Sequence, residues 1–165
     1  MKFIEETEKK INWKKLIAAL VICLTAAFIG SYFTSSSIED WYYTLEKPGF
    51  TPPNWIFGPV WGVLYILMGV SLYLVWKKGE FRKDVKLAMD VFGVQLVLNI
   101  LWSFFFFYIQ NPLAGFIEII ALWFMILLNV FLFYKISKPA AYLLTPYLMW
   151  VAYAANLNLY IWLLN

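Results

Sequence analysis

The sequence predicts an all-α membrane protein, a compact bundle of five transmembrane helices whose N-terminus lies in the cytoplasm. Hydrophobic residues make up 63% of the 165 residues and charged residues 14%, whereas soluble domains are about 45–50% apolar and about 25% charged. The apolar residues form five long runs, and Lys and Arg gather in the connectors on one side of these runs. Lipid is therefore the solvent that this composition fits.

The first span is expected at about residues 16–34. It contains an uncharged run of 18 residues, from Leu16 to Phe33, which as a helix would be roughly 27 Å long. Lysines before this run and small residues within it are also typical of a signal peptide. The run is longer than the usual apolar region of about 7–15 residues, so a span is favoured, and its retention stays open.

The other four spans are separated by short polar segments. A loop at about residues 35–55 contains the sequence WYYTLEKPGFTPPNW, whose three prolines and one glycine indicate an ordered loop and not a span. Asn111-Pro112 marks a helix start, with proline at the first helical position. The chain is expected to form one domain, 1–165, with its later spans at about 56–76, 85–108, 113–134 and 140–164.

The distribution of positive charge predicts the orientation. With five spans, one side receives twelve of the 13 Lys and Arg residues, and the other receives Lys47 alone. This asymmetry places the N-terminus inside and the C-terminus outside. It suits a bacterial plasma membrane better than a mitochondrial import substrate, and it indicates topology, not a nucleic-acid partner.

The residue types present exclude several kinds of chemistry. The chain has no histidine and one cysteine, Cys23, so a zinc site built from His and Cys, a Ser-His-Asp triad, an imidazole ligand for haem and an intrachain disulfide are excluded. We expect no metal site. The acidic residues within the spans, Asp90 and Glu118, are expected to form ion pairs near the membrane surfaces, although ionisable groups at such positions are functional candidates.

Three spans each carry one face that combines aromatic rings with amides or small residues. Helical spacing defines these faces, and amides facing lipid would be costly, so the faces should point into the bundle. They describe a pocket for a flat, largely apolar ligand. The alternative is that Gln95, Asn99, Asn129 and Asn158 only join helices. The faces consist of Trp61, Tyr65 and Met68; of Gln95, Asn99, Trp102, Ser103 and Phe106; and of Tyr147, Trp150, Ala154, Asn158 and Ile161.

Three segments together resemble the TspO/translocator family, the group of tryptophan-rich sensory proteins and peripheral-type benzodiazepine receptors. They are WYYTLEKPGFTPPNW with FGPVWGVLYILMG within 41–69, QLVLNILWSFFFF at 95–107, and AAYLLTPYLMWVAYAANLNLYIWLLN at 140–165. The resemblance implies a five-helix bundle, usually a homodimer, with the first loop as a lid. It also implies binding of porphyrins such as protoporphyrin IX and haem.

The resemblance assigns roles to particular residues. Trp61 and Trp150 match the tryptophans that face the ligand, and Trp41, Phe50 and Pro52 would belong to the lid. Pocket-lining positions are matched less strictly, and Tyr147 joins them from its helical face. The remaining predicted ligand-binding residues are Tyr65, Asn99, Ser103, Phe106 and Ala154.

Three classes of function are compatible with these features. The first is a membrane receptor, sensor or carrier that binds porphyrin or haem as a ligand, with no resident cofactor and no catalytic residue. The alternative is an enzyme that promotes light- and oxygen-dependent porphyrin breakdown, with Trp61 and Trp150 as redox-active groups. The third, a transporter, lacks the inverted repeats typical of that class. Sterol binding is not supported, because no cation follows Tyr160.

Overall fold

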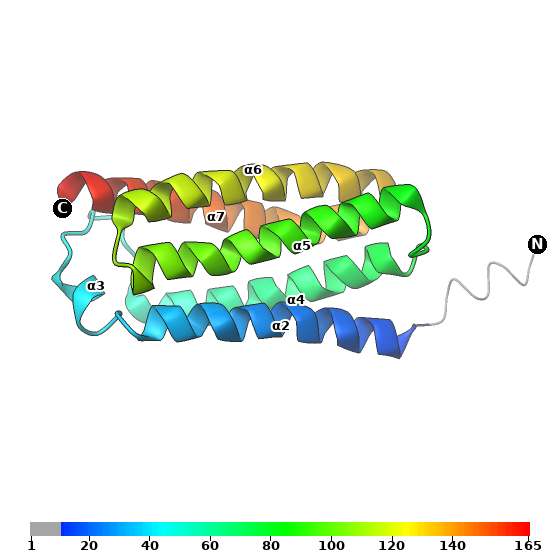
Figure 1. Ribbon diagram of the computed structural model, residues 1–165, viewed down its shortest axis with the longest axis horizontal. Helices are drawn as coiled ribbons and strands as arrows, with labels where there is room; N and C mark the ends of the chain where they lie inside the picture. The colour runs from blue at the N-terminus through cyan, green and yellow to red at the C-terminus, as the bar shows by residue number, and fades with distance from the viewer. Residues whose placement is uncertain (1–10) are drawn as a thin grey trace, which may run out of the picture.

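The computed structural model describes residues 11–165, and these fold into helices joined by short connectors (Figure 1). Five of the helices are long and apolar enough to cross a membrane. This confirms the predicted all-helical fold with five candidate membrane spans, and the orientation stays a prediction. Two helices are extended by other helical turns, a 3-10 turn η1 (Asn54–Ile56) before α4 and a π-helical turn η2 (Phe104–Tyr108) after α5. The five long helices are α2 (Trp13–Ser35), α4 (Phe57–Trp76), α5 (Lys83–Ser103), α6 (Pro112–Ile136) and α7 (Lys138–Leu164).

The helices form a closed ring. Going round it, α2 packs against α4, α4 against α7, α7 against α6, α6 against α5, and α5 against α2. Figure 1 shows the connector between α2 and α4, with its short helix α3 (Trp41–Thr44), at the same end of the bundle as the C-terminus. We call this the loop end. The α4–α5 and α6–α7 connectors lie at the opposite end, which we call the basic end.

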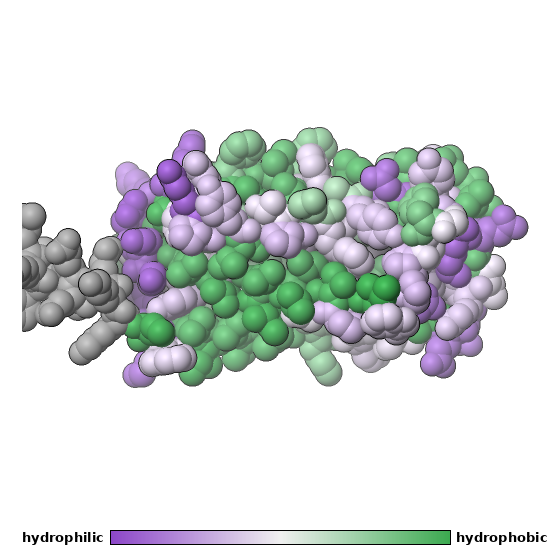
Figure 2. All heavy atoms as spheres, turned by 180° about the vertical axis from the view of Figure 1, so that it is seen from behind, coloured by the Kyte–Doolittle hydropathy of each residue, from purple (hydrophilic) through white to green (hydrophobic). Residues whose placement is uncertain are grey.

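The outer surface of the ring is apolar around its middle. Figure 2 shows a broad hydrophobic band on one side of the molecule, with hydrophilic side chains gathered at both ends. Every long helix contributes large exposed hydrophobic side chains. A soluble protein rarely exposes so large an apolar surface, so these side chains face lipid. They include Val21, Phe28, Val63, Val97, Phe124, Phe131 and Met149.

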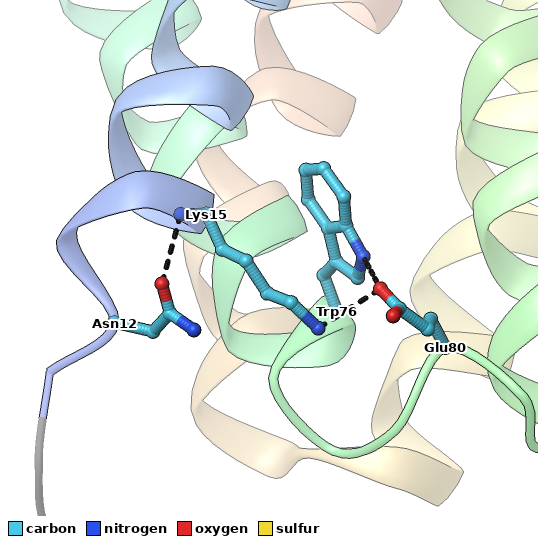
Figure 3. A network of polar contacts seen from close by, with 4 residues as sticks. All are labelled: Asn12, Lys15, Trp76 and Glu80. Atoms are coloured by element: carbon cyan, nitrogen blue, oxygen red, sulfur yellow. Dashed lines mark hydrogen bonds and ion pairs between the residues drawn. The ribbon is translucent and has the colours of Figure 1, made fainter.

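Polar contacts at the basic end join α2 to the end of α4 (Figure 3). Asn12 caps α2, because its side-chain oxygen accepts a hydrogen bond from the backbone N–H of Lys15. The ammonium of Lys15 lies 3.0 Å from the Glu80 carboxylate, which also accepts a hydrogen bond of 2.9 Å from the Trp76 indole. Hydrogen bonding to Lys15 and Trp76 lowers the pKa of Glu80 below its ordinary value.

The turn between α5 and α6 shows why the chain reverses there. In η2 the N–H of Ile109 bonds to the carbonyl of Phe104, and Gln110 then takes a left-handed conformation with φ of 57°. Asn111 caps the next helix by accepting a hydrogen bond from Ala114, and Pro112 stands at its first position, as the sequence predicts.

Helices α2 and α4 are in close contact at Gly69. A Cβ atom at this position would lie 2.8 Å from Leu20 Cδ2 and 3.0 Å from Leu20 Cα. We therefore expect Gly69→Leu to lower the free energy of unfolding by about 1–3 kcal/mol, as overpacking does. Gly93→Leu is the matched control, since Gly93 is exposed and a Cβ atom added there would meet no atom within 4 Å. Equal stability of the two variants in detergent would contradict the close approach.

Candidate ligand-binding cavity

A cavity of about 580 Å³ lies inside the ring at its loop end. This size lies within the range of about 300–1,000 Å³ found for small-molecule sites. Residues of α2, η1, α4, α5, η2 and α7 line it, and Ile38 and Tyr42 contribute from the connector after α2. Four of the five long helices therefore form one compartment whose walls come from distant parts of the sequence.

Stacked aromatic rings form one wall of this cavity. The rings of Trp61 and Trp102 lie 6.1 Å apart with 29° between their planes, and Trp102 stacks in turn on Phe106 at 5.8 Å and 24°. Tyr65 lies beside Trp61 at 5.8 Å. All four side chains line the cavity. Near-parallel rings of this kind favour offset stacking with a flat conjugated ligand.

A chain of buried hydrogen bonds leads from the cavity into the bundle. The Tyr65 hydroxyl donates to the Asn99 side-chain oxygen, and the Asn99 amide donates to the Tyr147 hydroxyl at 2.8 Å. Tyr147 in turn donates to Gln95 Oε1 at 3.1 Å. Tyr65 and Asn99 line the cavity, whereas Tyr147 and Gln95 lie behind them. The chain fixes the side chains that present polar atoms to the cavity.

Asn158 holds the indole of Trp102 in place. Its side-chain oxygen accepts a hydrogen bond of 3.1 Å from Trp102 Nε1, and its amide donates to the Pro112 carbonyl at 2.7 Å. Asn129, by contrast, donates to the Ala88 carbonyl away from the cavity. The sequence leaves open whether these amides line a pocket or only join helices, and the structure shows both cases. Asn99 and Asn158 line the cavity and also join helices, while Gln95 and Asn129 join helices only.

Six of the eight predicted ligand-binding residues line the cavity, and two do not. Tyr147 is fully buried behind Asn99. Trp150 is absent from the lining: its ring lies against Phe57 at 5.9 Å and Tyr153 at 5.5 Å. The tryptophan that stacks on Trp61 is therefore Trp102, which belongs to an inward face in the sequence but is not among the predicted ligand-binding residues. The six that line the cavity are Trp61, Tyr65, Asn99, Ser103, Phe106 and Ala154.

The connector between α2 and η1 covers the loop end of the cavity. Trp41 packs edge-on against Phe106 at 5.6 Å, and Tyr42 contacts both Phe106 and Phe107. Burial raises the pKa of Tyr42 to about 12. Of the three residues predicted for a lid, Trp41 reaches a cavity-lining ring, Phe50 packs on α7, and Pro52 is half-buried in the same connector.

Hydrogen bonds fasten this connector to α7. The side chain of Asn165 accepts a hydrogen bond of 3.0 Å from the backbone N–H of Glu46 and donates one of 3.1 Å to its carbonyl. Tyr153 donates to the Phe50 carbonyl at 2.9 Å. The rings of Phe50 and Tyr160 pack edge-on at 5.4 Å. Asn165 thus helps to hold the connector that covers the cavity.

Asn165→Ala is expected to loosen the cover without unfolding the bundle. Each hydrogen bond contributes about 0.5–1.5 kcal/mol, so amide exchange at Glu46 should accelerate about tenfold, a factor that corresponds to about 1.4 kcal/mol. Asn156→Ala is the control, because Asn156 is exposed and bonds to Ala152 within α7. Unchanged exchange at Glu46 in Asn165→Ala would show that the connector is held by other contacts.

The two acidic residues within the spans do not form the ion pairs that we expected. Among residues 11–165, no ion pair involves Asp90 or Glu118, and Arg82 pairs with Asp84 at 2.7 Å instead. Asp90 is exposed, and Glu118 is buried with no hydrogen-bond partner for either carboxyl oxygen. The Glu118 side chain points into the ring of helices, away from the cations at the membrane surfaces. The described residues contain no group of His, Cys, Asp and Glu side chains arranged to hold a metal ion.

The fold and the cavity define a helical integral membrane protein with an aromatic-lined compartment between its helices. Residues 19–163 match the TspO/MBR family, and the chain belongs to this family. It is 48% identical to the tryptophan-rich protein TspO of Archaeoglobus fulgidus over 155 residues, which cover 94% of this chain and 99% of that protein.

Two other relatives extend the similarity. The tryptophan-rich protein TspO of Chlorobaculum tepidum is 44% identical over 157 residues, covering 94% of this chain and 99% of the relative. The translocator protein of Homo sapiens is 36% identical over 136 residues, covering 82% of this chain and 80% of the relative. The similarity therefore spans the whole ring of helices and the cavity within it.

Proposed function

We propose that this protein binds a porphyrin, protoporphyrin IX or haem, in the cavity at the loop end, and acts as a membrane receptor, sensor or carrier for it. The observation that carries this proposal is the stack of Trp61, Trp102 and Phe106 along one wall of a cavity about 580 Å³ in volume. A flat macrocycle gains stacking from such a wall. Family membership supports the same class of ligand.

The polar groups of the cavity would orient the ligand. Asn99 and Ser103 stand next to the aromatic wall and present an amide and a hydroxyl, groups that fix the carboxylates or ring nitrogens of a porphyrin. The chain has no histidine, so an imidazole cannot ligate haem iron here. Binding therefore depends on the macrocycle and its substituents, and the free-base porphyrin fits as well as haem.

The protein is proposed to lie in a bacterial plasma membrane as a homodimer with its basic end inside. The α4–α5 and α6–α7 connectors lie at that end (Figure 1), and together with the adjoining helix ends they carry seven Lys and Arg residues, at 77–86 and 135–138. Lys47 stands at the other end, in the connector that covers the cavity. The positive-inside rule then places the cavity in the outer half of the membrane.

A dark titration with protoporphyrin IX tests the proposal. The purified protein should quench and shift the porphyrin spectrum saturably, and Ala154→Phe should weaken binding at least tenfold, because Ala154 lines the cavity and the added phenyl ring would occupy part of the space for the ligand. Asn156→Phe, with the same new side chain on the exposed side of α7, should bind like the wild type. No saturable binding, or equal binding by both variants, would contradict the proposed function.

The stacked indoles also favour a second candidate, light-driven porphyrin breakdown. Trp61 and Trp102 lie in contact beside the space that the pigment would fill, where an excited porphyrin would meet an oxidisable ring. Under light and oxygen, a lasting loss of the porphyrin band that Trp61→Phe abolishes would indicate catalysis. Recovery of unchanged porphyrin from the illuminated complex would leave binding as the function.

A further inference from the structure

The cavity is closed at the loop end but open at the side. At the loop end, Tyr42 is only 4% exposed and packs on Phe106 and Phe107. By contrast, two other lining residues, Phe28 of α2 and Trp55 of η1 at the start of α4, are 74% and 73% exposed. A side chain that lines a cavity and is also three-quarters exposed stands at its mouth. The mouth is thus bordered by α2 and by the segment formed by η1 and the start of α4.

The spacing of α2 and α4 explains this opening. The two helices touch at Gly69, where a Cβ atom would lie 3.0 Å from the Leu20 backbone. Towards the loop end, Gly58 and Gly62 also line the cavity, but a Cβ atom on either would meet nothing within 4 Å. The space beside these two glycines is therefore unfilled, although α2 and α4 are in close contact at Gly69.

The residues that border this gap can face the hydrocarbon chains of the bilayer. Three hydroxyl-bearing residues of α2 line the cavity there, Ser31, Thr34 and Ser35. Each hydroxyl donates to a carbonyl of its own helix, at 2.9 Å, 3.0 Å and 3.1 Å respectively. Polar groups satisfied within their own helix can face lipid, so the rim needs no water.

We propose that the gap between α2 and α4 is a lateral portal through which the ligand passes between the cavity and the surrounding bilayer. This inference rests on the proposed function and adds to it the route and the kind of ligand. A flat, apolar, membrane-partitioned molecule would reach the cavity from the lipid, with its carboxylates near the membrane surface, while the connector at the loop end stays fastened.

Exchange kinetics in lipid nanodiscs test the portal. Protoporphyrin IX association and dissociation would be followed by tryptophan quenching in the wild type, Gly62→Leu and a second portal variant, Gly58→Leu. A leucine in the gap should slow association and dissociation alike, each at least tenfold. The dissociation constant, which is the ratio of the two rate constants, should therefore change much less than either rate. Gly93→Leu, on the exposed side of α5, should exchange ligand like the wild type.

The Asn165→Ala variant separates the two possible routes. If ligand passes through the portal, loosening the connector should change both rates less than twofold. Unchanged rates in Gly62→Leu and Gly58→Leu, or faster exchange in Asn165→Ala, would overturn the portal while wild-type binding upholds the proposed function. Absence of saturable binding in the wild type would refute the proposed function and the portal with it.

Discussion

Replacing Asn99 by leucine is expected to lower the free energy of unfolding by about 2 kcal/mol, because a buried hydroxyl left without a partner costs about 1–3 kcal/mol. Asn99 accepts the hydrogen bond from Tyr65 and donates one to Tyr147. Leucine has a similar size but no polar atom. The Tyr65 hydroxyl, in a side chain only 5% exposed, would lose its acceptor. Unfolding of the detergent-solubilised protein measures the loss.

A second substitution identifies the cause. Removing both partners of a buried hydrogen bond costs far less than removing one, so Asn99→Leu combined with Tyr65→Phe should recover about 1 kcal/mol of the loss. Asn156→Leu, on the exposed side of α7, is the control and should be nearly neutral. A double variant less stable than Asn99→Leu alone would show that the hydrogen bond is not the source of the effect.

Trp102→Ala is expected to weaken protoporphyrin IX binding at least thirtyfold, whereas Trp150→Ala should leave it within threefold of the wild type. Trp102 stacks between Trp61 and Phe106 in the cavity wall. A buried aromatic anchor of this kind contributes about 2 kcal/mol or more, which is about thirtyfold in affinity. Trp150 is a matched control, because it is also a tryptophan within a span but lies outside the lining.

The comparison is made by dark titration with both variants folded to the same extent, as judged by thermal unfolding. Trp102→Phe provides a milder substitution that keeps a ring in the stack, and it should retain most of the affinity. Strong loss in Trp150→Ala with little change in Trp102→Ala would favour the assignment that the sequence resemblance implies, in which Trp61 and Trp150 face the ligand.

Much of the fold follows from sequence because lipid imposes simple constraints. Only helices of a given length satisfy their backbone groups in a bilayer, and the five long helices, with η2 counted as the end of α5, lie within about three residues of the predicted spans. The turn at Asn111-Pro112 was predictable because its cap and proline act locally. Helical spacing also places Asn99, Ser103 and Phe106 on one face, and the structure finds all three in one lining.

The parts that sequence could not predict depend on how the helices are arranged. Spacing shows which residues share a face, but not which helix lies opposite. Trp102 and Trp150 both belong to inward faces and both pack on α4, Trp102 against Trp61 and Trp150 against Phe57. Which residue of α4 each one meets depends on how the helices are rotated and shifted against one another. The π-helical turn η2, which widens the helix and brings both Phe106 and Phe107 to the cavity, has no sequence signal.

The contacts of the connector that covers the cavity could not be predicted from the sequence either. Its prolines indicate an ordered loop, but two of its hydrogen bonds are made with Asn165, which lies 119 residues after Glu46 in the chain. Glu118 is a further case, since its position near one end of a span favours an ion pair at the surface, whereas its direction buries it inside the ring. Contacts of this kind depend on tertiary structure and not on local pattern.

The structure of the protein with protoporphyrin IX bound, determined in lipid nanodiscs, tests the central claim most directly. We predict density for one macrocycle at the loop end of the ring, stacked on the wall of Trp61, Trp102 and Phe106, with Asn99 or Ser103 within hydrogen-bond distance of it. Density between Trp150 and Tyr153, or on the lipid-facing surface with the cavity unoccupied, would contradict the claim.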